Sequence, residues 1–153
     1  MTVQESLTSA SRTRQPGAAA AEFLAGCRVR RSRIHGLGLF TSRAVERRRK
    51  LGELSGELRR LPLARQQHQQ REVIQLVEFS RRWALDLTRG NAFRHLNHSC
   101  QANCYLRVIR RRIEVYSRGA ITAGAELTVD YGETMHRGGM ACTCGLPGCR
   151  GRI

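Results

Sequence analysis

The sequence lacks any long hydrophobic run. No stretch approaches the roughly eighteen consecutive apolar residues that suggest a membrane-spanning helix. The longest early apolar run is Ala18–Ala21, which is too short for the core of a signal peptide. Aromatic residues make up only 5% of the chain, and acidic residues number only 12. We therefore expect no membrane span and an intracellular location.

Lysine is almost absent as well, since Lys50 is the single lysine among 27 basic residues. The arginine excess gives a net charge of +15, which should attract phosphates or acidic proteins in a salt-sensitive way. Short basic runs occur at Arg47–Lys50 and Arg110–Arg112. Two interpretations stay open: a solvated surface that keeps the protein soluble, or a surface that contacts nucleic acid.

The 153 residues fit one domain with its own core, and the pattern predicts a mostly β fold with one modest helix. Residues 1–25 show no hydrophobic period and predict a disordered basic arm. The further expected elements are short strands near 28–30, 37–40, 50–58 and 126–129, a helix over 62–73, a hairpin pairing 75–79 with 83–87, a second hairpin over 107–116, and a mobile link at 138–139.

Six cysteines without a secretory signal argue against a disulfide framework. Cys142, Cys144 and Cys149 follow the spacing C-x-C-x4-C. Thiolates suit a tetrahedral zinc, and a structural site needs four ligands. We expect Cys100 to be the fourth ligand, which would join the C-terminal tail to the 97–103 loop. The remaining two cysteines, Cys27 and Cys104, are expected to be ordinary packed thiols.

Two polar segments precede this cysteine cluster. Residues Arg94–Asn103 read R-H-L-N-H-S-C-Q-A-N, and Glu126–Gly132 read E-L-T-V-D-Y-G. A polar N-H-S-C run alone could cap a helix, and D-Y-G alone is an ordinary turn. The order and spacing of the two segments and the cysteines therefore carry the inference.

Together these segments resemble the catalytic half of a SET domain, the fold of S-adenosylmethionine-dependent protein lysine methyltransferases. Gly36–Gly38 match the G-x-G of that family, and Glu53–Glu57 match its E-Y-x-G-E-like strand with leucine at position 54. Gly90–Asn103 match its G-N-x-x-R-F-I-N-H-S-C-x-P-N segment, with His95 for the aromatic residue and Ala102 for proline. The resemblance covers about residues 27–153 and is strongest to the SET1/trithorax branch.

The resemblance implies a SET-domain β fold with a pseudoknot, one short helical insert, a SET domain over 26–134 and a post-SET zinc tail over 135–153. It also implies a site for S-adenosylmethionine. The implied members of that site are Gly36, Leu37, Gly38, Asn97, His98, Leu146 and Ile153. The first three would approach the methionine part, the next two the adenine and amino-acid ends, and the last two would cover the adenine.

Tyr131 is the implied catalytic residue, at the channel where the methyl group meets a lysine amine. The reaction needs a neutral amine and an in-line approach, and no strong side-chain base. Tyr105 is a second candidate for this channel, with a surface tyrosine of the hairpin as the equal alternative. Leu54 and Val129 replace aromatic residues common in the family, so the sequence leaves the number of methyl groups added undecided.

Two functions remain open at this stage. The first is a zinc-containing lysine methyltransferase acting on a histone or another basic protein, in the nucleus on chromatin if the source is eukaryotic, or on a nucleoid protein in the cytoplasm if it is bacterial. The second is a non-catalytic, arginine-rich SET scaffold that binds nucleic acid or an acidic protein. Binding of S-adenosylmethionine separates them. The sequence does not indicate an oligomeric state.

Overall fold

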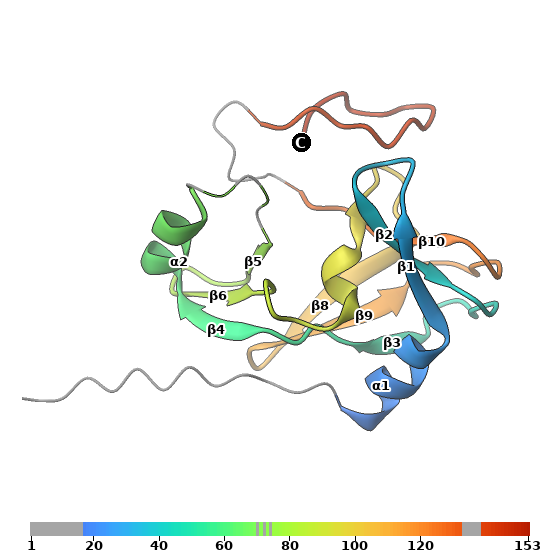
Figure 1. The fold of residues 1–153 in the computed structure, drawn as a ribbon, viewed down its shortest axis with the longest axis horizontal. Coiled ribbons are helices and arrows are strands. Elements are labelled where there is room, and N and C mark those ends of the chain that lie inside the picture. The colour runs from blue at the N-terminus through green and yellow to red at the C-terminus, as the bar shows by residue number, and fades with distance from the viewer. Residues whose placement is uncertain (1–16, 70, 72, 74, 133–138) are drawn as a thin grey trace, which may run out of the picture.

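The computed structural model describes residues 17–69, 71, 73, 75–132 and 139–153 (Figure 1). Within these residues short strands dominate, as the sequence predicts. The helical elements are α1 (Ala18–Ala25), α2 (Leu61–His68) and the 3-10 helix η1 (Ala92–His95). The strands are β1 (Cys27–Arg31), β2 (Leu37–Thr41), β3 (Lys50–Glu53), β4 (Glu57–Arg60), β5 (Leu76–Glu78), β6 (Trp83–Asp86), β7 (Asn97–His98), β8 (Cys104–Ile109), β9 (Arg112–Ser117) and β10 (Glu126–Val129).

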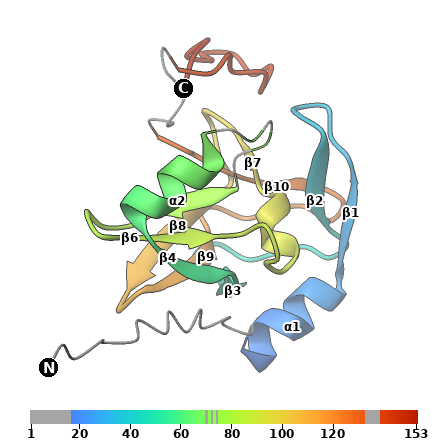
Figure 2. The same ribbon diagram turned by 60° about the vertical axis from the view of Figure 1, so that its left-hand side comes forward.

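The strands form three small sheets, with the orders β1-β2-β10-β7, β3-β9-β8 and β4-β6-β5. The pairing of β7 with β10 is parallel and joins Thr128 to Asn97 and Val129 to His98. This pairing brings the N-H-S-C segment beside the D-Y segment, although about thirty residues separate them in the chain. Figure 2 shows β7 and β10 next to each other, with the C-terminal tail above them.

The main core gathers apolar side chains from all three sheets, with Leu85 of β6 among them. Leu39, Leu127 and Val115 are fully buried there, as period-2 patterning requires. Helix α1 closes one side of this core with Ala20 and Phe23, and Phe23 stacks on Phe93 at a ring-centroid distance of 6.3 Å. These contacts order α1 against the core.

Helix α1 corrects one prediction. The sequence pattern suggested a disordered arm through residue 25, yet residues 18–25 form a helix. Residues 1–16 lie outside the described part. Only two residues of α1 are buried, so its sequence shows little helical periodicity. The apolar side chains that α1 contacts come from distant segments of the chain. Gly52 permits one of these contacts, because a side chain there would place its Cβ 2.6 Å from the Cβ of Ala20.

Two further predictions are correct in type and wrong in extent. The expected strand over 50–58 is broken into β3 and β4, which join different sheets. At the break, a side chain on Gly56 would collide with the backbone carbonyl of Asp86, so glycine permits this close approach. The insert helix ends at His68 rather than near residue 73. Pairing of β3 and β4 with different sheets sets the break between them.

Both predicted hairpins are confirmed, β5 with β6 and β8 with β9. The second hairpin turns at Arg110 and Arg111, which have φ values of 44° and 64°. Of the expected link at 138–139, Gly138 lies outside the described residues. No helix in the described part is long and apolar enough to span a membrane.

Candidate functional site

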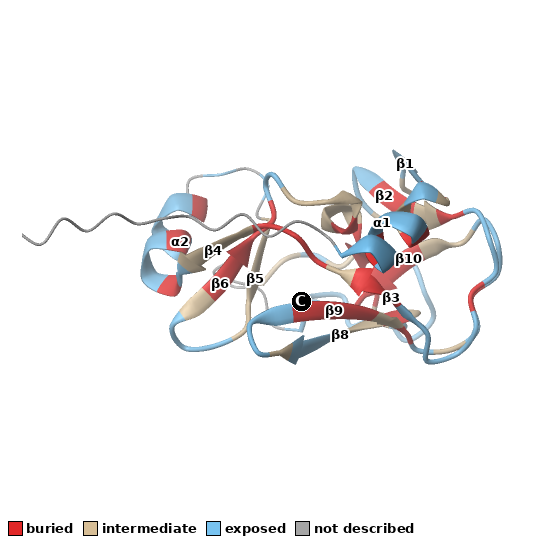
Figure 3. Ribbon diagram, turned by 90° about the horizontal axis from the view of Figure 1, so that it is seen from below, coloured by how far each residue is buried: buried red, intermediate tan, exposed pale blue. Residues whose placement is uncertain are grey.

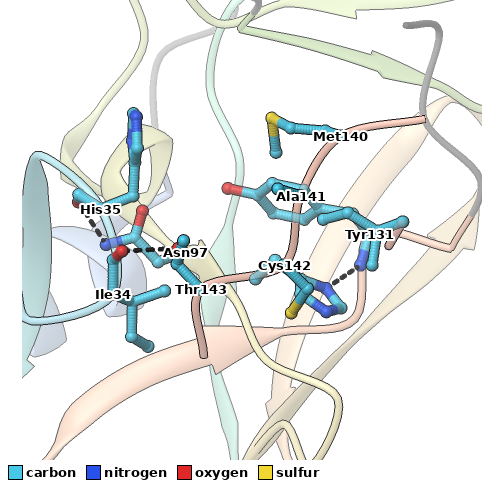
Figure 4. A pocket seen from close by; sticks show the side chains of 10 residues that line it. Ile34, His35, Asn97, Tyr131, Met140, Ala141, Cys142 and Thr143 are labelled. Carbon is cyan, nitrogen blue, oxygen red and sulfur yellow. Dashed lines mark hydrogen bonds between the residues drawn. The ribbon is translucent and has the colours of Figure 1, made fainter. Parts of the chain in front are cut away.

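A pocket of about 170 Å³ lies between the β1–β2 loop, strand β7, the segment after β10 and the C-terminal tail. Figure 4 shows the Tyr131 ring reaching across this pocket toward Asn97 and His35. The lining residues are Ile34, His35, Asn97, His98, Tyr131, Met140, Ala141, Cys142, Thr143 and Ile153. Four of the residues singled out from the sequence for the cofactor or the chemistry thus meet in one place, namely Asn97, His98, Tyr131 and Ile153.

Asn97 is buried and organises one wall of the pocket. Its Nδ2 lies 3.0 Å from the carbonyl oxygen of His35, 3.1 Å from that of Leu37 and 2.8 Å from Oε1 of Glu126. Two amide hydrogens therefore serve three acceptors. Ser32 also donates its hydroxyl hydrogen to Glu126, at 2.8 Å. This network fixes the loop between β1 and β2 against β7.

Tyr131 extends its ring across the pocket, and its hydroxyl group lies at the backbone of Leu96, the residue before Asn97. The residue is 44% exposed, but its hydroxyl end is enclosed and donates a hydrogen bond of 2.7 Å to the carbonyl oxygen of Leu96. Burial of the phenol, and secondarily the negative charge of Glu126, raises the pKa of Tyr131 to about 12. The phenol is therefore neutral across the physiological range and acts as a donor rather than as a base.

His98 joins the pocket to the cysteines. The backbone N–H of Tyr131 donates to Nδ1 of His98 at 3.1 Å, so Nδ1 is an acceptor and Nε2 carries the hydrogen of the neutral ring. Nε2 lies 3.4 Å from Sγ of Cys100 and therefore donates toward that sulfur. The ring of His98 also packs at 5.5 Å, centroid to centroid, against that of Tyr131.

The four cysteines converge as a potential metal centre. The Sγ atoms of Cys100, Cys142, Cys144 and Cys149 all lie within 4.8 Å of one another, and those of Cys100 and Cys142 are 3.7 Å apart. A tetrahedral Zn–S₄ site with bonds of about 2.3 Å places its sulfurs about 3.8 Å apart. All four cysteines are free of disulfides. The donor set and its spacing therefore fit zinc.

Hydrogen bonds favour the thiolate form of two of the four cysteines, Cys100 and Cys144. The backbone N–H of Arg150 donates toward Cys100 Sγ at 3.4 Å, and this contact, with help from His98, lowers the pKa of Cys100 to about 7. Backbone hydrogen bonds also lower the pKa of Cys144 to about 6, while desolvation raises that of Cys142 to about 12. A cation bound among the sulfurs would favour deprotonation of all of them.

The tail is anchored to the domain by contacts beyond the cysteines. Thr143 donates its hydroxyl hydrogen to the carbonyl oxygen of Ile34 at 2.7 Å. Arg150 pairs with Asp130 at 2.6 Å, the residue directly before Tyr131. The tail thereby forms part of the pocket wall, and Figure 1 shows it running above the sheets.

The glycine segment borders the pocket rather than lining it. Gly36, Leu37 and Gly38 lie beside the pocket, whose lining comes instead from the preceding residues Ile34 and His35. A side chain on Gly38 would collide with the carboxylate of Glu126. Glycine at position 38 thus leaves room for the Glu126 carboxylate that Asn97 and Ser32 bind, and Gly36 adopts a φ of 46° in open space.

Tyr105 and Leu146 are also outside this pocket. Tyr105 stacks on Tyr116, its partner across the β8–β9 hairpin, with ring centroids 5.5 Å apart. Leu146 is an exposed residue of the tail. Leu54 and Val129, where the family often has aromatic residues, are buried in the main core.

Sequence reasoning missed half of the lining. Ile34 and His35 precede the glycine segment, and Met140, Ala141 and Thr143 flank the first cysteine of the tail. The signal for four of them is only this adjacency, because their side chains mark no chemistry; His35 is a residue type that can carry chemistry, and its place beside Gly36 is the further signal.

Comparison with known proteins matches this geometry to one family. The SET domain family model matches residues 36–132. Over 80% of its length the chain is 37% identical to the histone-lysine N-methyltransferase set-2 of Caenorhabditis elegans. Over the same share it is 38% identical to the H3 lysine-4 specific histone-lysine N-methyltransferase of Schizosaccharomyces pombe. It is 34% identical, over a similar share, to the histone-lysine N-methyltransferase trithorax of Drosophila virilis.

The chain spans 9%, 14% and 3% of the lengths of these three relatives, respectively. The shared region therefore corresponds to one domain of much longer proteins. The matched residues 36–132 contain the parallel β7–β10 crossing and the pocket residues Asn97, His98 and Tyr131. With more than half of its residues matched and its expected crossing present, this chain belongs to the SET domain family.

Proposed function

We propose that this protein is an S-adenosylmethionine-dependent protein-lysine N-methyltransferase. One observation carries the proposal: the β7–β10 crossing gathers Asn97, His98 and Tyr131 around one pocket. The names of the SET-domain relatives support the same reaction. A scaffold without catalysis would have no need to keep these three polar side chains together.

The polarity of the pocket suits a cationic methyl donor. Carbonyl oxygens of His35, Leu37 and Leu96 converge near the side chains of Asn97 and Tyr131, together with the Glu126 carboxylate. Such acceptors favour a nearby positive charge. When bound, S-adenosylmethionine supplies an electrophilic methyl group on a positively charged sulfur. Asn97, His98 and Ile153 are the residues we assign to holding it, with Gly36, Leu37 and Gly38 shaping the loop beside it.

Tyr131 is assigned the role of orienting the lysine amine. Its high pKa keeps the hydroxyl protonated, so the oxygen can accept a hydrogen bond from an amine while the hydroxyl continues to donate to the Leu96 carbonyl. A free lysine amine has a pKa of about 10.4, and a neighbouring sulfonium would lower that value by charge repulsion. The neutral amine can then attack without a strong base, and positioning supplies much of the rate. Tyr105 has no place in this scheme.

Zinc is assigned to Cys100, Cys142, Cys144 and Cys149, with a structural role. Holding the tail against the 97–103 loop would fix Met140, Ala141 and Ile153 at the pocket. Leu146 is assigned to covering the adenine. We accordingly place the SET domain at 26–134 and the zinc tail at 135–153. Metal binding would contribute directly to the folding of the tail.

The proposed substrate is a lysine of a histone or another basic protein, presented in an extended segment. One relative is named for lysine 4 of H3. In a eukaryotic source the site of action would be chromatin in the nucleus; in a bacterial source, a nucleoid protein in the cytoplasm would be the target.

Isothermal titration of the zinc-loaded protein with S-adenosylmethionine tests the proposal. We expect a single site, with binding abolished in Asn97→Ala. Asn91→Ala is the matched control, since Asn91 also donates to a backbone carbonyl, that of Glu53 at 2.8 Å, but lies outside the pocket. Absence of binding in folded, zinc-replete protein would instead support the non-catalytic scaffold.

A further inference from the structure

Two arginine-bearing turns meet around Trp83, outside the pocket. The turn between β5 and β6 carries Arg81 and Arg82, and that between β8 and β9 carries Arg110 and Arg111. Arg60, at the end of β4, pairs in register with Trp83 on β6. Figure 3 shows both turns exposed at the same end of the molecule. We call these five arginines the Trp83 cluster.

The ring of Trp83 orients two members of the cluster. The guanidinium carbon of Arg60 lies 4.5 Å from the ring centroid and that of Arg111 lies 5.1 Å from it. Such cation–π contacts hold a guanidinium by its face, so its N–H edge remains available to an external acceptor. Orienting the side chains in advance reduces the entropy cost of binding.

The cluster is not neutralised by the protein. All five arginines are exposed, and none forms an ion pair with an acidic side chain in the described part of the chain. Nearby arginines behave differently, since Arg59 pairs with Glu57 and Arg65 with Glu78. The two turns and the end of β4 therefore gather five exposed arginines, without an acidic partner among the described residues, around one aromatic ring.

The turn at Arg110–Arg111 has an unfavourable backbone for these residues. Both have positive φ values in a two-residue hairpin connection, where Asn-Gly or Gly is preferred. A turn built from the preferred residues would carry no positive charge at these two positions, whereas this turn carries two guanidinium groups. This departure from the preferred turn residues supports a use for the charge.

We infer that the Trp83 cluster is a docking surface for the phosphate backbone of nucleic acid. Arginine donates two parallel hydrogen bonds to phosphate, and several oriented guanidiniums within one patch match a row of phosphates. Because the contacts are to phosphate, binding is expected to be independent of base sequence. The inference does not depend on methyltransferase activity.

The test is fluorescence anisotropy with a labelled duplex DNA of random sequence and the zinc-loaded full chain, over a series of salt concentrations. The variant Arg82→Gln/Arg110→Gln/Arg111→Gln is compared with Arg31→Gln/Arg47→Gln/Arg118→Gln. The control removes the same charge from exposed arginines outside the cluster, none of which makes a side-chain hydrogen bond or an ion pair in the described structure. Circular dichroism and the melting temperature verify that both variants fold.

We expect the cluster variant to bind about tenfold or more weakly. The slope of its log affinity against log salt concentration should become shallower by about one for each phosphate that is no longer neutralised. The control variant should change the affinity by less than about threefold. Trp83→Leu, which keeps every charge, should weaken binding by an intermediate factor.

Two outcomes would overturn the inference. Equal weakening in the two triple variants would show that the DNA is attracted by the overall charge rather than by the Trp83 cluster. Equally tight, equally cluster-dependent binding of polyglutamate would replace nucleic acid with an acidic protein as the partner.

Discussion

The backbone N–H of Tyr131 donates a hydrogen bond to Nδ1 of His98, and this contact decides which ring nitrogen of His98 faces Cys100. Nε2 then directs its hydrogen toward the sulfur, 3.4 Å away. A histidine that lines the pocket thus also supports the cysteine centre. The proposed methyl-donor site and zinc site share one side chain.

Removing this shared side chain should weaken both sites. We expect His98→Ala to lower the affinity for zinc and for S-adenosylmethionine by about 10- to 100-fold each, as for other residues that support metal ligands. Zinc affinity is measured by competition with a chromogenic chelator, and donor affinity by titration. His95→Ala, outside the pocket, is the control. Loss of donor binding with zinc affinity unchanged would show that the contact to Cys100 has no effect on the metal.

Replacing Tyr131 tests the assigned chemistry. Tyr131→Phe removes the hydroxyl and retains the ring, so we expect kcat to fall about 100-fold or more while the affinity for S-adenosylmethionine changes little. Removal of the hydrogen bond to Leu96 should cost about 1 kcal/mol of stability. Tyr105→Phe, in the stacked pair with Tyr116, should retain full activity. Similar falls in kcat for the two variants would refute the role given to Tyr131.

The pH dependence of the rate follows from the state of the phenol and the amine. Because the pKa of Tyr131 is raised to about 12, its protonated form persists throughout the usable alkaline range. Only ionisation of the substrate lysine then controls the rate, which should rise with pH and level off below the free-lysine pKa of about 10.4, because the sulfonium lowers the pKa of the bound amine. A decline of kcat below pH 10 in protein that stays folded would indicate that another group must be protonated.

The cysteine centre predicts a stoichiometry and a structural consequence. Purified protein should contain about one zinc per chain. Cys100→Ser should lose the metal, and hydrogen exchange over 139–153 should accelerate because the tail loses its anchor. Cys27→Ser replaces a buried thiol outside the cluster and should keep the metal. Full zinc content in Cys100→Ser would exclude Cys100 as a ligand.

The insert is stabilised by a buried acidic residue. Asp86 accepts hydrogen bonds from the N–H and hydroxyl of Thr88 at 2.9 and 2.6 Å, and its Oδ2 lies 3.1 Å from Nε2 of the fully buried His68. Burial alone would raise the pKa of Asp86, but the contacts to Thr88 and His68 outweigh it and the pKa is lowered. The stability that charged Asp86 gives the folded protein is thus complete above the pKa of an unfolded aspartate, about 3.9. This stability is lost as the pH falls below that value.

We expect Asp86→Asn to lower the free energy of unfolding by about 1–3 kcal/mol at neutral pH. The difference from wild type should shrink below about pH 4. Asp130→Asn, in an exposed pair with Arg150, should cost less than about 1 kcal/mol. Chemical denaturation at a series of pH values measures the free energy of unfolding of wild type, Asp86→Asn and Asp130→Asn. A difference that persists unchanged in acid would mean that Asp86 is not charged in the native state.

The sequence predicted those features that depend on local pattern or on motif order. The β8–β9 hairpin follows from alternation around a polar turn, and the meeting of Cys100 with the tail follows from the need for a fourth ligand. Helix α1 and the break at Gly56 could not be predicted, since each depends on a close approach between distant segments. The positions of Ile34 and Met140 at the pocket also depend on tertiary packing, and neither side chain marks chemistry.

Transfer of a labelled methyl group is the most direct test of the central claim. Zinc-loaded protein is incubated with labelled S-adenosylmethionine and core histones, or with a total basic-protein extract from the source, and the product is mapped by mass spectrometry. We predict label on a lysine side chain, absent with Tyr131→Phe. No labelled lysine in any fraction, from protein that binds S-adenosylmethionine and contains zinc, would contradict the account.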